Sequence, residues 1–396
     1  MRRDEDLGRL AAGGIIEAPE RMLAGRGLLP GTPLVIERTD DGVLLLPVLP
    51  DAKRIYVEPT TRCNLACTTC IRHSWDEKPV DLDYALFAGL VAQLRSFPNL
   101  ESAHFAGFGE PLLHPRIFDM LDAMHEAGVG TEMTTNGLML DDSAARRLMD
   151  VGLGTLIVSV DGVEPATYGV VRPGADLPQV LHNLRRVARI RDEAGRPRPR
   201  LGVEFVAMRS NCQEIADLLR LATEMRLDYV VISNLLPYSQ KMAGEILYGD
   251  GNFDLPVSPW YHWHWGMERL RLPQMRLRTE RLCRFVDRAA FAVTADGMVS
   301  PCYSMMHSHT EHVLGRRKRV ERWAAGDLRE RSLLDIWTAP EYVRFRSRVR
   351  RFDFPSCPDC QSVDGCYFSQ SNAEDCWMNT PSCADCLWSR GMIVCF

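Results

Sequence analysis

Six segments with the composition of β-strands alternate with amphipathic segments between residues 53 and 235. Alternation of this kind predicts a parallel sheet with helices outside it. Eight such units close a barrel, and six fall short of that number. We therefore expect an α/β fold built on a partial, TIM-like (β/α)6 barrel that is open on one side. The expected strands are Arg54–Val57, Ser102–Phe105, Gly130–Thr134, Thr155–Val160, Leu201–Ala207 and Tyr229–Ile232.

The amphipathic segments between these strands are the expected helices. In the first, Leu86, Leu90 and Leu94 recur on one face, and Asp81 precedes them. A carboxylate at this position accepts hydrogen bonds from the free N–H groups of the first helical turn, so we expect Asp81 to cap the helix. The expected helices cover residues 81–94, 115–126, 141–151, 179–191 and 212–225.

Thirteen cysteines in a chain of 396 residues narrow the chemistry. The N-terminus lacks an apolar signal region, and no apolar run reaches the roughly 18–20 residues of a membrane helix. We therefore expect a cytoplasmic protein with no membrane partner, in which cysteines indicate metal or redox chemistry rather than disulfides. The formal net charge of −5 gives no sign of a nucleic-acid partner.

Three of the cysteines lie directly after the first expected strand. Cys63, Cys67 and Cys70 form the pattern C-x3-C-x2-C. Thiolates select iron–sulfur clusters or zinc over hard cations, and a cluster held entirely by protein takes four of them. Three thiolates would leave one iron of a four-iron cluster open to another ligand. The alternative is a zinc site with a fourth ligand from elsewhere, for which His73 is close in sequence.

Polar segments follow the next three expected strands. They are Ala106–Pro111, Thr134–Gly137 and Ser159–Gly162, and Glu204 and Asn234 are weaker candidates on later strands. Active sites of β/α barrels form at the C-terminal ends of the strands. Taken singly, each of these residues is more often a cap or turn former, but the ordered set favours a site shared with the cysteines.

This combination resembles the radical SAM superfamily. The resemblance implies a 4Fe-4S cluster on the three cysteines, whose open iron binds S-adenosylmethionine (SAM) and whose electron cleaves it to a 5′-deoxyadenosyl radical. It also implies an electron donor such as ferredoxin or flavodoxin. The positions that match the family's SAM-binding segments are Gly107, Gly109, Glu110, Asn136, Ser159 and Asp161.

The C-terminal cysteines resemble the SPASM extension of that superfamily, which holds two auxiliary 4Fe-4S clusters. Its expected ligands here are Cys283, Cys302, Cys357, Cys360, Cys366, Cys376, Cys383, Cys386 and Cys395. Two full clusters need eight thiolates, so either one of the nine is spare or one cluster is ligated unusually. Position 370, where the extension usually has a cysteine, is Gln. A zinc ribbon that pairs Cys357 and Cys360 with Cys383 and Cys386 is the alternative.

Local signatures resemble one subgroup, the radical SAM maturases of tungsten-cofactor oxidoreductases. They include Tyr56-Val57-Glu58, Trp75–Lys78, Ser233–Pro237 and the ending from Pro381. The resemblance implies that the partner is an aldehyde ferredoxin oxidoreductase or its pterin cofactor. Sulfatase-oxidising relatives carry an aspartate where this chain has Tyr303. A SPASM maturase of a ribosomally made peptide remains the alternative.

The remaining segments divide the chain. Residues 1–50 resemble the swapped-hairpin module of transition-state regulators, residues 51–265 form the expected barrel, and residues 266–396 form the irregular cysteine-rich domain. Between 316 and 351, twelve Lys or Arg face five acids, which is typical of a solvated helical face or of a docking patch for an acidic partner. The aromatic run 261–265 either packs in the core or lines the surface that faces the substrate.

Overall fold

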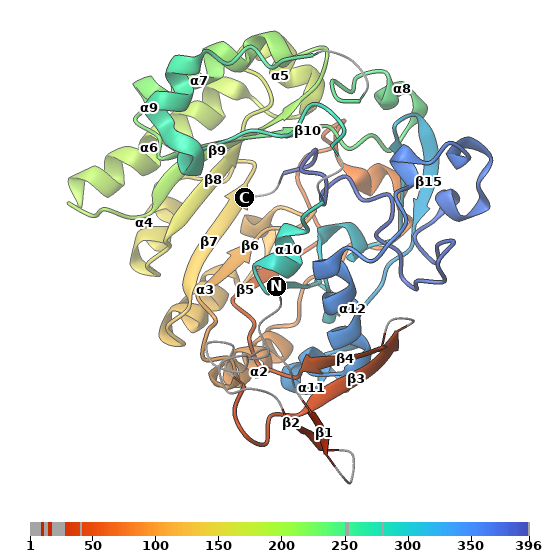
Figure 1. Ribbon diagram of the computed structural model, residues 1–396. Coiled ribbons are helices and arrows are strands. Elements are labelled where there is room, and N and C mark those ends of the chain that lie inside the picture. Colours follow the sequence, from red (N-terminus) through yellow and green to blue (C-terminus); the bar gives the residue numbers. More distant parts are fainter. Residues whose placement is uncertain are drawn as a thin grey trace.

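A curved parallel sheet with helices along its outer side forms the centre of the molecule (Figure 1). The computed structural model describes residues 9–11, 15–17, 28–39, 42–249, 253–278 and 281–394. Cys395 lies outside the described residues, so the predicted ninth thiolate has no structural account. Among the described helices, none combines the length and apolar character that would let it span a bilayer.

The six predicted strands are confirmed, with ends that agree to within two residues. They pair in parallel and in chain order, and almost every residue in them is shielded from solvent, as expected for a sheet covered on both faces. The strands are β5 (Arg54–Val57), β6 (Ser102–Phe105), β7 (Gly130–Thr135), β8 (Thr155–Ser159), β9 (Arg200–Ala207) and β10 (Tyr229–Asn234).

The predicted helices also form, with one correction at a cap. Asp83, and not Asp81, caps the first helix by accepting from Leu86 N at 2.9 Å. Asp81 is instead held by Thr60 and Arg62 of the cysteine loop. An extra helix, α5, was not predicted. The helices are α2 (Tyr84–Gln93), α3 (Ile117–Glu126), α4 (Asp142–Asp150), α5 (Pro165–Val171), α6 (Leu177–Glu193) and α7 (Ile215–Glu224).

The sheet is an open, partial barrel, as predicted. Its strand order is β11-β10-β9-β8-β7-β6-β5-β12-β13-β16, and within the described residues its two edge strands do not pair with each other. The C-terminal half contributes strands to it, because β12 pairs in parallel with β5. A domain division at residue 265 therefore stays a proposal. The added strands are β11 (Leu270–Arg271), β12 (Ala290–Val293), β13 (Met298–Ser300) and β16 (Gly326–Asp327).

The N-terminal segment contains the predicted hairpin. Strands β3 (Leu34–Thr39) and β4 (Gly42–Pro47) are antiparallel, and a shorter pair, β1 (Arg9–Ala11) and β2 (Ile15–Glu17), precedes them. The hairpin packs against helix α12 (Pro340–Arg351), where Val35 and Leu46 meet Val343 in one buried cluster.

Many of the basic side chains in segment 316–351 are buried or form ion pairs within the protein. Lys318 and Arg346 are buried, and Arg316, Arg322 and Arg348 pair with Asp385, Asp296 and Glu37. This pairing weakens the interpretation as a docking patch. The segment comprises β15 (Arg316–Val320), β16, α11 (Leu333–Trp337) and α12. Strand β15 pairs with β14 (His309–Val313).

The aromatic run lies on α9 (Pro259–Arg269), which follows the short helix α8 (Gln240–Ala243). Trp265 is 4% exposed and belongs to the core. Trp260 is half exposed and stacks on His264 at 4.7 Å between ring centroids. This placement fits the core-cluster interpretation for Trp265.

Candidate active site and auxiliary thiol sets

The three N-terminal cysteines share one cleft with the polar strand ends. Parallel strands present their C-terminal ends at the same edge of the sheet, so segments far apart in sequence meet there. The cleft measures about 300 Å³ and is lined by Cys63, Cys67 and Cys70 together with Gly107, Gly109, Glu110, Asn136 and Ser159. The structure therefore brings these predicted residues together in one cleft, and their roles towards a cluster or SAM stay a prediction. Among the predicted set, Asp161 is the residue that does not line the cleft.

The cysteine loop is held in shape by its own polar residues. Asp81 accepts from Thr60 Oγ1 at 2.6 Å and from Arg62 Nη2 at 2.7 Å. Burial opposes ionisation of Asp81, but the hydrogen bonds from Arg62 and Thr60 outweigh it and lower the pKa of this carboxyl. The Thr68 N–H donates to Val171 O at 2.9 Å. The loop is thus fixed before Cys63 and again between Cys67 and Cys70.

Two glycines let the next loop pass close to the cysteine loop. A Cβ on Gly107, whose φ is +117°, would lie 2.5 Å from Glu58 Cγ. A Cβ on Gly109 would lie 2.0 Å from Thr60 O. Real Cβ atoms do not approach other heavy atoms this closely, and the positive φ of Gly107 disfavours other residues as well, so both positions favour glycine.

Glu110 uses both of its carboxylate oxygens within the protein. Oε1 accepts from Thr135 Oγ1 at 2.7 Å and from Leu112 N at 3.1 Å, and Oε2 accepts from Asn136 N at 2.8 Å. Burial raises the pKa of Glu110. The side chain ties the end of β6 to the end of β7. Asn136 Nδ2 in turn donates to Asn64 Oδ1 at 2.7 Å, next to Cys63.

Two arginines that the sequence did not single out accompany the thiols. Arg172 Nη1 lies 3.8 Å from Cys67 Sγ, and its Nε donates to Asp161 at 2.8 Å. Arg72 Nε lies 3.3 Å from Cys70 Sγ. Burial raises the pKa of Cys67 to about 11 although Arg172 opposes it. A set of bound cations would reverse this effect, because metal-coordinating thiols are deprotonated. Two guanidinium groups suit a site that holds several thiolates.

The two weaker sequence candidates, Glu204 and Asn234, both line the cleft but have different hydrogen-bond partners. Glu204 lines the cleft and accepts from Ser159 Oγ at 2.7 Å. Burial raises the pKa of Glu204. Asn234 also lines the cleft, but its amide donates to Gln274 O and Met392 O. Asn234 therefore attaches the C-terminal segment to β10.

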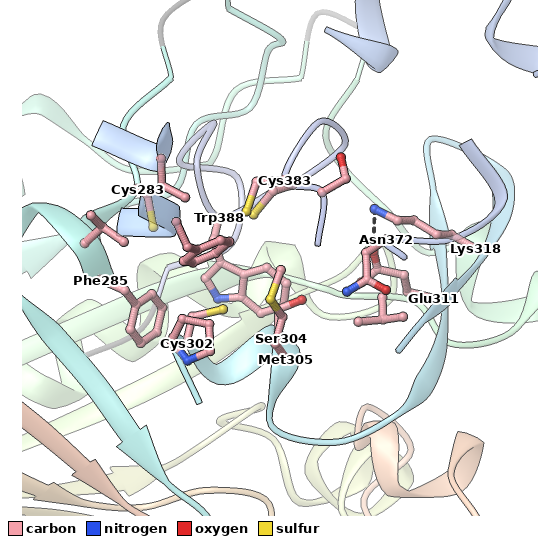
Figure 2. Close-up of a pocket in the computed structure, with 17 residues that line it drawn as sticks. Cys283, Phe285, Cys302, Ser304, Met305, Glu311, Lys318, Asn372, Cys383 and Trp388 are labelled. Atoms are coloured by element: carbon pink, nitrogen blue, oxygen red, sulfur yellow. Dashed lines mark ion pairs between the residues drawn. The ribbon is translucent and has the colours of Figure 1, made fainter. Parts of the chain in front are cut away.

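Four C-terminal cysteines surround a second cavity (Figure 2). Burial raises the pKa of Cys283 to about 12 and those of Cys302 and Cys383 well above the usual value. Around the thiols lie Trp388, Phe285 and the ion pair of Lys318 with Glu311, at 3.8 Å. The cysteines are Cys283, Cys302, Cys383 and Cys386.

The other four described C-terminal cysteines form a second set, in which Cys357 is buried and Cys366 is half-buried. Beyond the effect of burial, Cys366 acts electrostatically on Cys357 and on Cys376, and Cys360 acts on Cys376, to raise the pKa of each. Cys360 and Cys376 are exposed, unlike any cysteine of the first set. The eight described thiols therefore divide four and four, which matches two clusters with four protein ligands each.

This division separates the pairs that a zinc ribbon would join, since Cys383 and Cys386 share a cavity with Cys283 and Cys302. In the described part of the chain, no three Cys, His, Asp or Glu side chains are arranged to hold a single metal ion. Thiols spaced around a cavity fit a larger body, such as an iron–sulfur cluster, better than one zinc ion.

A buried charge network joins the cysteine-rich half to the cleft. His307 donates from Nε2 to Glu58 at 2.9 Å and from Nδ1 to Glu77 at 2.6 Å. Burial opposes the positive charge, but the two carboxylates outweigh it and raise the pKa of His307 to about 9. Glu58 also accepts from Phe108 N in the glycine loop. No local sequence pattern indicated this network.

Comparison with known families agrees with the geometry. The radical SAM superfamily matches residues 57–222, and the SPASM iron–sulfur cluster-binding domain matches residues 283–361. The first range contains Cys63, Cys67 and Cys70 and the strand ends that share their cleft, and the second contains the first four predicted auxiliary ligands.

Individual relatives extend this agreement over most of the chain. The tungsten-containing aldehyde ferredoxin oxidoreductase cofactor-modifying protein of Pyrococcus furiosus is 36% identical over 346 residues, which are 87% of this chain and 97% of that protein. The PqqA peptide cyclase of Xanthomonas axonopodis pv. citri is 24% identical over 328 residues, which are 76% and 78% of the two chains.

The fold is shared with a solved structure. Streptococcus suis SuiB bound to S-adenosylmethionine superposes with a TM-score of 0.56 at 16% identity, over 82% of this chain and 73% of SuiB.

Proposed function

The chain belongs to the radical SAM superfamily and carries its SPASM extension, and from that premise we propose that it is a maturase of a tungsten-containing oxidoreductase. Membership makes it an enzyme whose cofactors are 4Fe-4S clusters and SAM. The substrate is the part that we propose: the pterin cofactor of an aldehyde ferredoxin oxidoreductase, or that enzyme's polypeptide.

We assign the SAM-binding cluster to Cys63, Cys67 and Cys70. The observation that carries this assignment is their common cleft with the strand ends at Gly107, Gly109, Asn136 and Ser159. When bound there, the cluster and SAM supply a 5′-deoxyadenosyl radical by one-electron reductive cleavage.

The surrounding residues prepare the cleft. Arg72 and Arg172 place positive charge beside the thiolates, and Asp161 positions Arg172 from a buried site rather than touching the cleft. Glu110 fixes the backbone of Asn136. Fixed dipoles and charges of this kind cost no reorganisation when charge moves during the reaction.

The auxiliary clusters are assigned to the two thiol sets, Cys283/Cys302/Cys383/Cys386 and Cys357/Cys360/Cys366/Cys376. A ferredoxin or flavodoxin is proposed as the electron donor. The partner is proposed from the relative in Pyrococcus furiosus, whose name states that it modifies a tungsten oxidoreductase cofactor. The alternative, a peptide maturase, is supported by the more distant likeness to a PqqA peptide cyclase.

The first test measures SAM cleavage. We expect the reconstituted, reduced protein to release 5′-deoxyadenosine, and the Cys63/Cys67/Cys70 triple substitution to abolish the release while iron falls from about twelve to about eight per chain. Cys212→Ala is the matched control, because Cys212 lies outside all three thiol sets, and it should retain iron and cleavage. Full iron without 5′-deoxyadenosine would disprove the activity.

The second test separates the two substrates. The protein is incubated with SAM, reductant and either the cofactor-bearing tungsten oxidoreductase or a candidate precursor peptide encoded nearby. A mass change in the oxidoreductase or in its extracted cofactor supports the proposed maturase. A mass change confined to the peptide supports the alternative.

A further inference from the structure

An arginine-lined cavity lies at the opposite end of the barrel strands from the cysteine cleft. Arg200 begins β9, Asp228 immediately precedes β10, and Arg271 ends the short edge strand β11. Arg284 and Arg288 come from α10 (Arg284–Asp287) and the residue after it. With Arg269, these side chains line a cavity of about 760 Å³.

The charge of this cavity is strongly unbalanced. It has five guanidinium groups, and Asp228 is the one carboxylate among the described residues that line it. Asp228 is already engaged, because it accepts from Leu201 N at 2.9 Å and lies 3.7 Å from Arg191. Burial, followed by the charges of Arg288, Arg54 and Arg284, lowers the pKa of Arg271. Like charges near one another raise the energy of the charged forms, and an anion bound among them would lower it.

The cavity borders the packed interior of the barrel. Tyr229 lines it and packs in one buried cluster with Val231 and Val394, and both of those residues line the cysteine cleft. Tyr229 and Ser233 lie on the same side of β10, four residues apart, which corresponds to about 13 Å along a strand. The arginine cavity and the cysteine cleft therefore lie towards opposite ends of β10, with this packed cluster between them.

We propose that this cavity binds the phosphate group of a small organic phosphate. Guanidinium groups match phosphate oxygens through paired hydrogen bonds, and a phosphate monoester carries about −1.5 to −2 charges at neutral pH, so it compensates several arginines where a carboxylate compensates one. Arg200, Arg269 and Arg284 are exposed, which gives the ligand access from solvent. The proposal does not depend on which substrate the radical modifies.

The test is a titration of the reconstituted full chain with pyrophosphate and with inorganic phosphate, followed by calorimetry and by 31P NMR. We expect saturable binding of pyrophosphate that saturating SAM does not compete away. The Arg284→Gln/Arg288→Gln variant should weaken binding at least tenfold. Arg284→Lys/Arg288→Lys keeps the positive charges but loses the paired guanidinium hydrogen bonds. Its dissociation constant for pyrophosphate should lie between those of the wild type and the double Gln variant.

Controls separate the site from general charge. Arg220→Gln removes an exposed arginine on α7 and should leave the dissociation constant within twofold. Arg200→Gln probes the cavity from β9 without touching the neighbourhood of Cys283, and it should weaken binding even if the double variant fails to fold. Tighter binding of an acidic peptide than of pyrophosphate, or equal binding by the wild type and Arg200→Gln, would overturn the proposal.

Discussion

Arg172 and Asp161 form a buried ion pair, with Arg172 Nε 2.8 Å from Asp161 Oδ2 and the two side chains 9% and 0% exposed. The pair links the end of β8 to the segment that follows α5, and it directs the far side of the guanidinium towards Cys67. Asp161 also accepts from Val206 N. The same ion pair therefore stabilises the barrel and positions a positive charge beside Cys67.

Arg172→Gln should destabilise the protein strongly. Removing one partner of a buried pair leaves the other charge uncompensated, which typically costs about 3–5 kcal/mol. We expect the free energy of unfolding in urea to fall by about that amount. The double variant Arg172→Gln/Asp161→Asn, whose Asn still accepts from Val206 N, should recover part of the loss. A double variant less stable than the single one would contradict this explanation.

Gly109→Ala should displace the cysteine loop. The added Cβ would meet Thr60 O at 2.0 Å and Arg62 O at 2.7 Å, so one backbone segment must move. We expect lower iron content at the three-cysteine site and at least tenfold weaker SAM binding, measured by iron analysis and equilibrium dialysis. Gly89→Ala is the matched control. It lies in the exposed interior of α2 with open space around it and should stabilise the protein by about 0.5–1 kcal/mol.

The elements that could be predicted from sequence are those whose signals are local. Each parallel strand is a short apolar run, and each strand end carries its polar residues within a few positions, so the cleft followed from chain order. The cap of α2 was missed because Asp81 and Asp83 are both suitable acids, and Thr60 and Arg62, about twenty residues earlier, claim Asp81.

Features that depend on distant contacts could not be predicted. Arg172 reaches Cys67 across 105 positions, and His307 reaches Glu58 across 249. The partition of the auxiliary cysteines likewise depends on the return of residues 383–386 to the region of Cys283 and Cys302. Spacing alone left that partition open, because eight thiols with similar local surroundings can be grouped in several ways.

Stability should decline at alkaline pH through His307. Its pKa in the folded protein is raised to about 9, above the unfolded value of about 6.5. The stabilisation is therefore complete below about pH 6.5 and is lost as pH rises through about 9. The difference in pKa corresponds to about 3 kcal/mol. We expect the free energy of unfolding to fall between pH 6.5 and 9.5.

His307→Gln should remove this dependence, because the amide does not titrate. His182→Gln, an exposed position on α6, should keep the wild-type profile. Denaturant titrations at half-unit pH intervals measure the three profiles. A wild-type curve that is flat over this range would refute the assignment of the imidazolium to the pair of carboxylates.

The two auxiliary sites should differ in their resistance to chelators. Cys360 and Cys376 are exposed, whereas Cys302, Cys383 and Cys386 are partly buried around their cavity. We expect a chelator under anaerobic conditions to remove about four irons from the set that contains Cys360 and Cys376 before it removes those of the other set. The iron that the chelator removes first should be missing from the Mössbauer spectrum of Cys360→Ala. The iron that it removes last should be missing from the spectrum of Cys302→Ala. Simultaneous loss of both fractions in wild type would argue against the partition.

Lys318 should raise the reduction potential of the cluster that we propose for Cys283, Cys302, Cys383 and Cys386. The ammonium is buried, pairs with Glu311 at 3.8 Å and lies in the cavity of Cys283, Cys302, Cys383 and Cys386 (Figure 2). Two unit charges about 10 Å apart interact by about 1.7 kcal/mol at an effective dielectric constant of about 20. For a one-electron couple, that energy corresponds to about 70 mV.

Lys318→Met should therefore make the potential about 70 mV more negative, because reduction adds a negative charge that the ammonium would have stabilised. Lys318→Met/Glu311→Gln removes both charges and should return the potential towards the wild-type value. Arg317→Met, on the exposed face of the same strand, should have little effect. Potentiometric titration followed by EPR measures all four proteins. If the single and double variants had the same potential, packing in the cavity rather than charge would control it.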